Sequence, residues 1–500
     1  AKFVSESGVP SGDYYVIYNY NEEKAYGHKS FKSVEDINKD DELVLWADLN
    51  IAKNTYAANV DLKHLYAKIR VQLLNVPNDL TSDLDIGIYS SKKGFPYLKW
   101  FTSTGLIDAE RGEYMNASGS LVDGYFASNR RFHNIQLGEY KCEYKWDEQT
   151  HTSSYDYSKA ASMSALILPT DLSGEDIFFY VLDKYSGTCY EIKKKNGVNF
   201  KAGTNYNVKL DLSADSTVVS KLTRGTPVGG MAEGYYQIKY AADWRHAAYR
   251  SNYYNNYEII DDISFEGEYF FPISTYRLYG NGHTLSDINL DWSHEDNVGL
   301  VRFESTSTYS LGMQCNISDL TLNKVTFKGN NYVGAFGGKN ISLTNCSVIG
   351  ASAIIGQGDY VGGIVGANSF DGLMNEVRVG QECTISGVNY VGGLVGRYMS
   401  TDRYSTSLNL YSSKTLLESC KSEAEVTATG DYVGGIFGKI GGNYMYNNTS
   451  VSNDYNSDVK YTFSLIKCIN EGDVTGKNYV GGIGGDFALN SYDNTVEDKV

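Results

Sequence analysis

The sequence predicts an all-β chain: an N-terminal antiparallel β-sandwich, followed by a parallel β-helix, or solenoid. Three observations predict it. The 500 residues include 51 glycines and 43 tyrosines but only 6 prolines, a composition typical of β-rich chains. Apolar and polar residues alternate with a period of two in the first half. In the second half an eight-residue motif recurs five times.

Residues 1–213 carry the alternating pattern. From 65 to 73 the odd positions are apolar and the even positions polar, and 206–212 repeat the alternation. This pattern is typical of strands with one buried face. Further strands are expected at 13–20, 43–47 and 177–183, with turn-forming residues between them. Several short strands joined by polar turns favour a sandwich.

Residues 214–233 show no sustained apolar period. Small and polar residues lead to Arg224, Gly225, Thr226 and Pro227, and then to a pair of glycines. We interpret this stretch as a linker.

Residues 234–500 contain the repeat. Its copies are 331–338, 359–366, 389–396, 431–438 and 478–485, with a shorter copy at 297–301. The motif tyrosines Tyr332, Tyr360, Tyr390, Tyr432 and Tyr479 are 28, 30, 42 and 47 residues apart. Unequal periods around one shared motif predict a solenoid whose loops are inserted at fixed places.

Each motif copy is expected to form one short strand whose valine stacks on the valine of the next coil. The paired glycines permit positive φ and close backbone approach where the coil bends. A solenoid leaves open strand edges only at its ends, which therefore need caps. We expect residues 241–248 to form a short helix that plugs the first coil.

The motif Tyr-Val-Gly-Gly-(Ile/Leu)-Val-Gly resembles the GLUG repeat of bacterial surface proteins, among them large secreted peptidases. The segment 276–285 (Tyr-Arg-Leu-Tyr-Gly-Asn-Gly-His-Thr-Leu) resembles the first coil of such arrays. The resemblance covers roughly the C-terminal half and implies a parallel β-helix over 234–500.

The first half resembles the fimbrillin-like family of cell-surface proteins, through residues 64–74, 165–169 and 200–206. That resemblance implies a β-sandwich of the fimbrillin/transthyretin-like kind and a role in adhesion. It also implies either fimbrial assembly with other subunits or lipid anchoring in the outer membrane through a residue upstream of Ala1. A solenoid replaces the second sandwich of the family, which favours a tip or accessory role over a shaft subunit.

Charge and motifs restrict the function. The chain has 44 Lys and Arg against 60 Asp and Glu, a net charge of −16, which argues against nonspecific binding of nucleic acid or anionic lipid. No apolar run is long enough for a membrane span. Seven cysteines include no CxxC pair, and no HExxH, P-loop or Gly-x-Ser-x-Gly motif is present, so we predict no catalytic residues, metal site or cofactor.

Three groups of residues leave alternatives open. Asp261 and Asp262 near the Gly-Asn-Gly-His of 280–283 fit either an acid–base pair acting on a sugar or, as we favour, the structure of the first coil. The Asn or Asp before each motif tyrosine fits a calcium ladder or, more simply, a turn. Cys346, Cys420 and Cys468 precede their tyrosines by 14, 12 and 11 residues; they fit stacked interior side chains better than a disulfide or a reactive thiol.

The two longest spacings between motif tyrosines, 42 and 47 residues, predict where the ligand-binding surface lies. Insertions at 397–414 and 439–460 begin directly after adjacent motif copies, so they are expected on the same side of the solenoid. Tyrosine suits contact with glycans or proteins because its ring is apolar and its hydroxyl polar, and loops on a rigid scaffold often carry function. The expected ligand-binding residues are Tyr398, Tyr404, Tyr411, Tyr444, Tyr446 and Tyr455. The alternative is that these loops pack only on each other and on the coils.

These observations favour a cell-surface adhesion protein, located on the outer membrane or in a fimbria, that binds a host or microbial surface glycan or protein and is not an enzyme. A carbohydrate-active enzyme with a site on the β-helix face, and a structural spacer that binds nothing, are the alternatives.

Overall fold

The computed structural model describes most of the second half of the chain and separate strands of the first. The described residues are 2–4, 12–18, 30–31, 45–51, 57–59, 61, 63–64, 67–77, 80, 84–90, 105–108, 113–115, 135–140, 143–147, 149, 152–156, 163–167, 170–183, 186–226, 234–250, 255–302, 315–369, 372–399, 413–441 and 461–488. They are strands and turns with a single helix, α2 (Ala241–Arg250), so the all-β prediction is confirmed. No helix in this described part is both long and apolar enough to cross a membrane.

The chain divides into two compact units. Unit 1 is built from Ala1–Ser128 and Phe132–Val219, and unit 2 chiefly from Ser220–Val500. Unit 1 holds a five-stranded sheet in the order β11 (Ile135–Tyr140), β8 (Leu84–Ser90), β16 (Ile177–Asp183), β17 (Thr188–Lys194), β20 (Thr217–Lys221), and a three-stranded sheet in the order β14 (Met163–Ile167), β7 (Ala67–Leu74), β19 (Asn205–Asp211).

The other strands of unit 1 form small two- and three-stranded sheets. They are β1 (Lys2–Val4), β2 (Gly12–Tyr18), β3 (Ser30–Phe31), β4 (Leu45–Ile51), β5 (Ala57–Asn59), β6 (Lys63–His64), β9 (Gly105–Asp108), β10 (Glu113–Met115), β12 (Glu143–Asp147), β13 (Thr152–Asp156), β15 (Thr170–Asp171) and β18 (Asn199–Phe200).

Alternation along β7 follows the sequence pattern. Ala67, Ile69 and Val71 are fully buried, while the residues between them are exposed, because successive side chains of a strand point to opposite faces. The prediction of a wholly antiparallel domain is wrong for one pair of strands: β19 lies parallel to β7. Alternation alone does not distinguish the two directions, since it reports only which face is buried.

The predicted linker contains ordered structure. Residues 217–221 form β20, the edge strand of the five-stranded sheet, and Arg224 bridges to Tyr236. The linker interpretation of 214–233 is therefore wrong for its first half, while residues 227–233 lie outside the described part. Five residues are too few to show a period, so the β-branched Thr217, Val218 and Val219 were the only signal for this strand.

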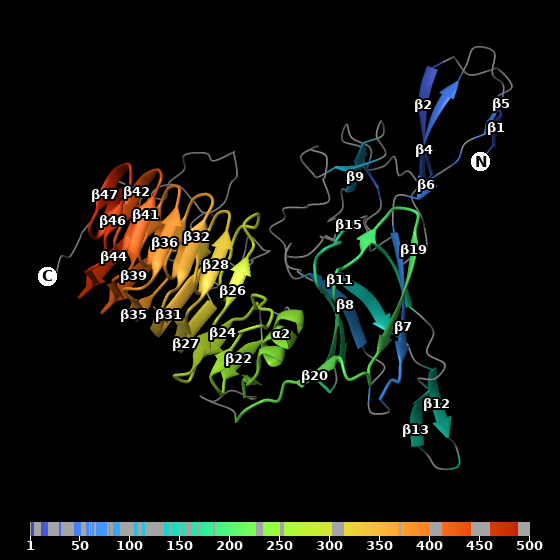
Figure 1. Cartoon of the computed structure of the whole chain (residues 1–500), viewed down its shortest axis with the longest axis horizontal. Coiled ribbons are helices and arrows are strands. Elements are labelled where there is room, and N and C mark those ends of the chain that lie inside the picture. Colours follow the sequence, from blue (N-terminus) through green and yellow to red (C-terminus); the bar gives the residue numbers. More distant parts are fainter. Residues whose placement is uncertain are drawn as a thin grey trace, which may run out of the picture. The chain divides into compact units, whose positions relative to one another are not determined.

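Unit 2 consists of four parallel sheets, visible in Figure 1 as strands that follow one another from green to red. The first sheet runs β21 (Tyr236–Ile238), β22 (Asn256–Ile259), β24 (Arg277–Tyr279), β27 (Cys315–Asn323), β31 (Ile341–Ile349), β35 (Met374–Val379), β39 (Ser413–Glu418), β44 (Tyr461–Ile466), with β23 (Ile263–Ser264), β25 (Thr284–Ser286), β40 (Lys421–Ser422) and β45 (Ile469–Asn470) beside this path. The second runs β26 (Asn289–Asp291), β28 (Thr326–Gly329), β32 (Ala353–Gly356), β36 (Thr384–Gly387), β41 (Glu425–Ala428), β46 (Val474–Thr475).

The third and fourth sheets contain the repeated motif. The third runs β29 (Val333–Gly334), β33 (Val361–Gly362), β37 (Val391–Gly392), β42 (Asp431–Gly434), β47 (Asn478–Gly481). The fourth runs β30 (Gly337–Lys339), β34 (Val365–Ser369), β38 (Val395–Met399), β43 (Phe437–Gly441), β48 (Gly484–Ala488).

We call one passage of the chain through the four sheets a rung. Five rungs contain a full copy of the motif, and they are 315–339, 341–369, 374–399, 413–441 and 461–488. The coil before them, 277–301, contains the shorter copy, in which Val298 bridges to Val333 and Val301 to Gly337. The motif valines pair in register from rung to rung, in the order Val333, Val361, Val391, Val433, Val480. The predicted stacking of the valines is therefore confirmed.

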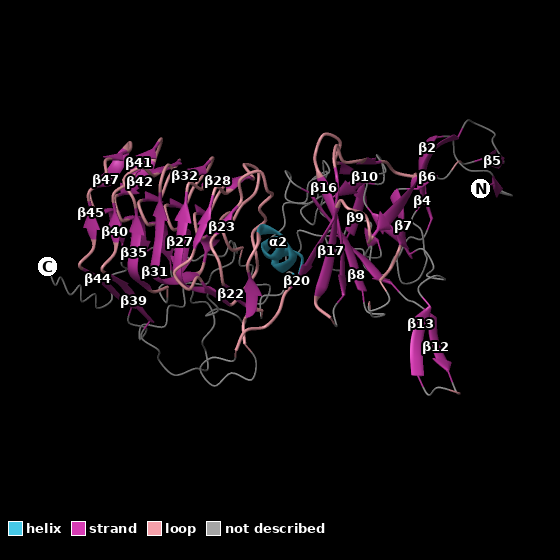
Figure 2. Cartoon of the chain, turned by 60° about the horizontal axis from the view of Figure 1, so that its bottom comes forward, coloured by secondary structure: helices cyan, strands magenta, loops and turns pink. Residues whose placement is uncertain are grey.

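Helix α2 covers the start of the rung stack. The predicted helix is confirmed and extends two residues further, to Arg250; it is the cyan element of Figure 2. Asp243 caps its N-terminus by accepting hydrogen bonds from the backbone N–H groups of Lys239 and Tyr240, both at 3.0 Å. Trp244 is fully buried against Phe265 and Phe270. Because Phe270 in turn contacts Phe327 of the first rung, the helix packs on the interior of the stack.

Candidate functional site

The motif tyrosines of the five rungs form one continuous stack. Neighbouring ring centroids, from Tyr332 to Tyr479, are 4.6–4.9 Å apart, and neighbouring ring planes lie within 10° of each other. Aromatic pairs in such geometry contribute about 0.5–1.5 kcal/mol beyond the area that they bury. Both ring faces of Tyr360, Tyr390 and Tyr432 therefore contact a neighbouring ring, whereas Tyr332 and Tyr479 at the two ends of the stack each have one such neighbour.

All five tyrosines adopt the left-handed backbone conformation, with φ between 53° and 65°. This conformation costs an L-residue about 1–2 kcal/mol, and the ring contacts offset that cost. In the shorter copy Asn297, an amino acid that tolerates the same conformation, has a φ of 63°. In the described rungs positive φ, which the paired glycines would permit, is therefore adopted by the motif tyrosine and not by those glycines.

The motif glycines instead allow neighbouring rungs to approach. A Cβ atom on Gly363 would lie 2.2 Å from the carbonyl oxygen of Gly393, and one on Gly393 would lie 1.9 Å from that of Gly435. Both distances are far below van der Waals contact. The second motif glycine is thus required by the following rung at Gly363 and Gly393, whereas the first copy accommodates the buried Ala335 at the same position.

The residues before the tyrosines alternate between Asp and Asn along the stack. Each hydrogen-bonds the equivalent residue of the next rung, and the contacts are Asn331 N to Asp296 Oδ1 (2.9 Å), Asp359 N to Asn331 Oδ1 (2.8 Å), Asn389 Nδ2 to Asp359 Oδ1 (2.9 Å), Asp431 N to Asn389 Oδ1 (2.8 Å) and Asn478 Nδ2 to Asp431 Oδ1 (2.8 Å). Alternation keeps an amide between successive carboxylates, which avoids like-charge repulsion. In each of these hydrogen bonds a backbone or side-chain amide donates to the side-chain oxygen of an Asp or Asn. Both residue types are thus explained by turn contacts, which supports the turn interpretation over a calcium ladder.

Cationic side chains of the fourth sheet lie beside the tyrosine stack. Lys339 Nζ is 3.5 Å from the ring centroid of Tyr332, and Lys439 Nζ is 4.2 Å from that of Tyr432. Arg397, which is buried, lies 4.9 Å from the Tyr390 ring and donates a hydrogen bond to the Gly441 carbonyl. Such cation–π contacts contribute about 0.5–2 kcal/mol. Burial raises the pKa of Tyr332 and Tyr390.

One corner of the rungs carries insertions of variable length. It joins the fourth sheet to the first. Between β30 and β31 only Asn340 intervenes, whereas 400–412 follow β38 and 442–460 follow β43. Strands β38 and β43 are paired, with Tyr398 beside Ile440, and the chain re-enters the first sheet at the paired residues Ser413 and Tyr461. Both long insertions therefore leave and rejoin adjacent rungs at the same corner, as predicted, although they begin three residues later than expected.

Tyr398 does not belong to this surface. It is fully buried in β38, where it pairs with Asn368 and Ile440 on either side, and burial raises its pKa well above the usual range. The prediction that it contacts a ligand is wrong, because the strand continues past the motif into the insertion. Alignment of the motif copies places the apolar Ile440 at the same position, a signal that predicts burial. The other five predicted tyrosines, Tyr404, Tyr411, Tyr444, Tyr446 and Tyr455, lie outside the described residues.

The rung cysteines line the interior. Cys346 and Cys420 are buried and Cys468 is half-buried; all six described cysteines are free thiols. Cys346 pairs with Leu320 and Val377, apolar residues of the neighbouring rungs, which supports the interpretation as stacked interior side chains. Burial raises the pKa of Cys346 to about 12, so its thiol is protonated at neutral pH and unreactive.

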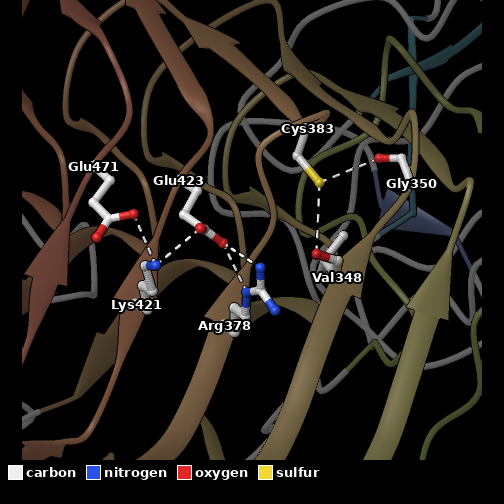
Figure 3. Close-up of polar contacts among 7 residues, drawn as sticks. All are labelled: Val348, Gly350, Arg378, Cys383, Lys421, Glu423 and Glu471. Atoms are coloured by element: carbon white, nitrogen blue, oxygen red, sulfur yellow. Dashed lines mark hydrogen bonds and ion pairs between the residues drawn. The ribbon is translucent and has the colours of Figure 1, made fainter.

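A charged cluster crosses three rungs on the outer face. In Figure 3 Glu423 lies between Arg378 and Lys421, with nitrogen–oxygen distances of 2.6 and 2.9 Å, and Lys421 also contacts Glu471 at 2.8 Å. Hydrogen bonds from Lys421 and Arg378 lower the pKa of Glu423. The cluster thus connects the third, fourth and fifth rungs electrostatically.

Glu423→Gln is expected to lower the free energy of unfolding by about 0.5–1 kcal/mol at pH 7, the range of partly exposed ion pairs. Because the native pKa of Glu423 is depressed, its contribution is present above the ordinary carboxyl pKa and is lost as the pH falls through the native value. Urea unfolding should therefore show a difference in stability between the variant and the unchanged protein at pH 7, and this difference should shrink as the pH falls through the depressed pKa of Glu423. Glu425→Gln, at an exposed position two residues away, is the matched control; an equal loss in both variants would contradict the assignment.

The residues considered for acid–base chemistry make turn contacts. Asp262 accepts a hydrogen bond from the backbone N–H of Thr284 at 2.8 Å and lies 3.2 Å from His283 Nδ1, while Asp261 accepts one from the N–H of Asp262. Asn281 has a φ of 53° and bonds the carbonyl of Ile259. These contacts favour the structural interpretation of the first coil. Among the described residues no group of three or more His, Cys, Asp or Glu is placed to hold a metal ion.

Comparison with known proteins found a similarity that covers only part of the chain. No family model matches the chain. The chain is similar to Halomucin of Haloquadratum walsbyi (strain DSM 16790 / HBSQ001), with 29% identity over 153 residues. The match covers 25% of this chain and 2% of Halomucin, so the chain spans only a small part of that protein's length.

Proposed function

We propose that the protein is a cell-surface adhesin, in which a parallel β-solenoid formed by unit 2 presents a ligand-binding surface made of the insertions 400–412 and 442–460. Unit 1 is proposed to be a fimbrillin-like sandwich, and the solenoid repeats to be of the GLUG kind. The protein is proposed to be an accessory or tip component of a fimbria, or a lipid-anchored protein of the outer membrane. The partial likeness to Halomucin is compatible with this proposal and does not identify a ligand.

The observation that carries the proposal is the shared corner of adjacent rungs. In-register pairing of β38 with β43 and of Ser413 with Tyr461 places the four ends of the two insertions on neighbouring strands, which are about 4.8 Å apart in a sheet. The insertions therefore start close together on a rigid support, an arrangement common in binding sites. Their Tyr, Asn and Ser side chains supply the flat apolar and hydrogen-bonding groups that glycan and protein surfaces require.

The tyrosine stack itself is less suited to this role. Recognition of a sugar ring by an aromatic residue uses the ring face, and the faces of Tyr360, Tyr390 and Tyr432 are covered by their neighbours. We therefore assign the stack to stability and the insertions to binding.

Tyr404→Ala combined with Tyr444→Ala is expected to reduce binding to a glycan array or to target cells by about tenfold or more, because aromatic side chains contribute much of the energy at binding surfaces. Thermal unfolding should stay unchanged. Tyr240→Ala removes a tyrosine that is 60% exposed outside the insertions and serves as the control, with binding retained.

Unchanged binding in the double variant would refute the assignment to these loops. The same glycans should be assayed for cleavage, because release of reducing ends would favour a carbohydrate-active enzyme over an adhesin.

A further inference from the structure

Two cysteines lie side by side in adjacent rungs, Cys420 in the fourth and Cys468 in the fifth. The residues two places before them, Glu418 and Ile466, are paired, and so are the residues directly after them. The register is thus the same on both sides of the cysteines, which places them next to each other. Neighbouring strands are about 4.8 Å apart, and this spacing lies within the range of roughly 4.4–6.8 Å between the Cα atoms of a disulfide.

This adjacency is specific to one pair. The interior column that contains the two residues reads Leu320, Cys346, Val377, Cys420 and Cys468. Val377 separates Cys346 from Cys420, so Cys346 has only apolar neighbours in the column. Of the described cysteines, Cys420 and Cys468 are therefore the two that stack directly on each other.

The backbone bends at both cysteines. Each follows a residue in the left-handed conformation, Ser419 with a φ of 55° or Lys467 with a φ of 52°. Cys420 consequently lies between β39 and β40, and Cys468 between β44 and β45. A disulfide brings its Cβ atoms to roughly 3.5–4.5 Å, slightly less than the strand spacing. A bend between two short strands accommodates this adjustment better than the middle of a continuous strand does.

The two thiols also interact before any bond is formed. Cys468 Sγ is 3.3 Å from the carbonyl oxygen of Leu417, so it leans toward the rung that holds Cys420. A hydrogen bond between the two thiols lowers the pKa of Cys468 and raises the pKa of Cys420. Cys468 is therefore the thiol that ionises first, and a thiolate is the nucleophile in thiol–disulfide exchange.

The pair encloses one of the two long insertions. A bond between Cys420 and Cys468 closes a ring over residues 421–467, and this ring contains β43, the insertion 442–460 and the start of β44 at Tyr461. The insertion leaves from the fourth rung and returns to the fifth. A covalent link between these two rungs therefore fixes the support of the insertion.

We propose that Cys420 and Cys468 form a disulfide that joins the fourth and fifth rungs once the chain enters an oxidising compartment. This inference rests on the proposed location at the cell surface, because disulfides form and persist outside the reducing cytoplasm. The reduced pair, with both thiols free, is the form from which the bond is made.

The oxidant is a second disulfide, either of a small molecule such as oxidised glutathione or of a thiol oxidoreductase. The Cys468 thiolate attacks one sulfur of that disulfide, which forms a mixed disulfide and releases one thiolate. Cys420 then loses its proton and attacks the Cys468 sulfur, which releases the second thiolate of the reagent. Two protein thiols are oxidised, the reagent disulfide is reduced to two thiols, and the two protons pass from the cysteines to those thiols.

Peptide mapping tests whether the bond forms. The full chain is unfolded in urea, refolded in a buffer of reduced and oxidised glutathione, alkylated and digested. We expect one peptide pair linked through Cys420 and Cys468, and Cys346 in its alkylated form. A refolded chain with no such linked pair overturns the proposal, as does a main product in which either cysteine is linked to another partner.

Thermal unfolding tests the effect of the bond on the stack. Reduction of the oxidised chain with dithiothreitol is expected to lower the unfolding midpoint of unit 2 by about 5–10 °C. Cys420→Ala should abolish this difference, and Cys468→Ala replaces it if the first variant does not fold. Cys346→Ala removes a thiol of the same column and, as the matched control, should keep the difference.

A difference that persists in Cys420→Ala and Cys468→Ala would contradict the assignment. Ligand binding is measured separately from the disulfide. A linked pair in a chain that binds no ligand would therefore refute the adhesin proposal alone, and ligand binding without the linked pair would refute this inference alone.

Discussion

Gly393→Ala is expected to lower the free energy of unfolding by about 3 kcal/mol, the upper range for overpacking of a filled interior. The new Cβ atom would lie 1.9 Å from the Gly435 carbonyl oxygen and 2.2 Å from Ser422 Oγ. Relief requires the third and fourth rungs to separate, which breaks the bond from the Gly393 N–H to the Gly434 carbonyl, now 3.1 Å long. Urea unfolding monitored by far-ultraviolet circular dichroism measures the loss.

Gly482→Ala provides the matched control for this experiment. It changes the same motif position in the fifth rung, where no atom lies within 4 Å of the new Cβ, and its effect is expected to stay within about 0.5 kcal/mol. Both variants should be measured at low protein concentration, so that association does not contribute to the apparent stability. Equal losses in the two variants would show that the glycine is not required by the following rung.

The repeat made much of unit 2 predictable from the sequence. A shared Tyr-Val-Gly core sets the register, and the structure pairs Val361 with Val391 and Val391 with Val433 although 30 and 42 residues separate them. Helix α2 was predictable as well, because the exposed end of a stack of strands needs a capping element. The alanine-rich segment with Trp244 supplies that element.

Other features depend on contacts that the motif does not reveal. The left-handed tyrosines exist because each ring is held by its neighbours, so the conformation is favourable only in the stack. Tyr398 is of a residue type that is common on binding surfaces. Its burial follows from the continuation of β38 past the motif. The alternation of Asp359 with Asn389 is visible in the sequence, but its meaning requires knowing that the two side chains meet.

The second prediction with a large expected effect concerns the deletion of a whole rung. Deletion of residues 332–359 removes β29 to β32 and part of the turn after them, which is one full rung, and joins Asn331 to Tyr360 so that the motif is restored. In the shortened stack Asn331 would lie beside Asn389, a neutral pair that keeps the amide hydrogen bonds. Because each rung contacts only its neighbours, stability should fall by the contribution of one rung and its interface. The protein is expected to fold with a single cooperative transition.

Deletion of 332–345, half as many residues, is the matched comparison. It leaves β28 followed by a fragment of β31, so the remaining segments can no longer meet their own sheets, and the valine, tyrosine and Asp/Asn columns are interrupted together. This variant is expected to lose the cooperative transition of unit 2 and much of its β-sheet signal, although it removes less of the chain.

The measurement that tests the central claim most directly is therefore urea unfolding of these two deletion variants beside the unchanged protein. If one copy of the motif marks one rung, the 28-residue deletion retains a cooperative transition and the 14-residue deletion does not. Loss of the transition in both variants, or its retention in the shorter deletion, would contradict the account.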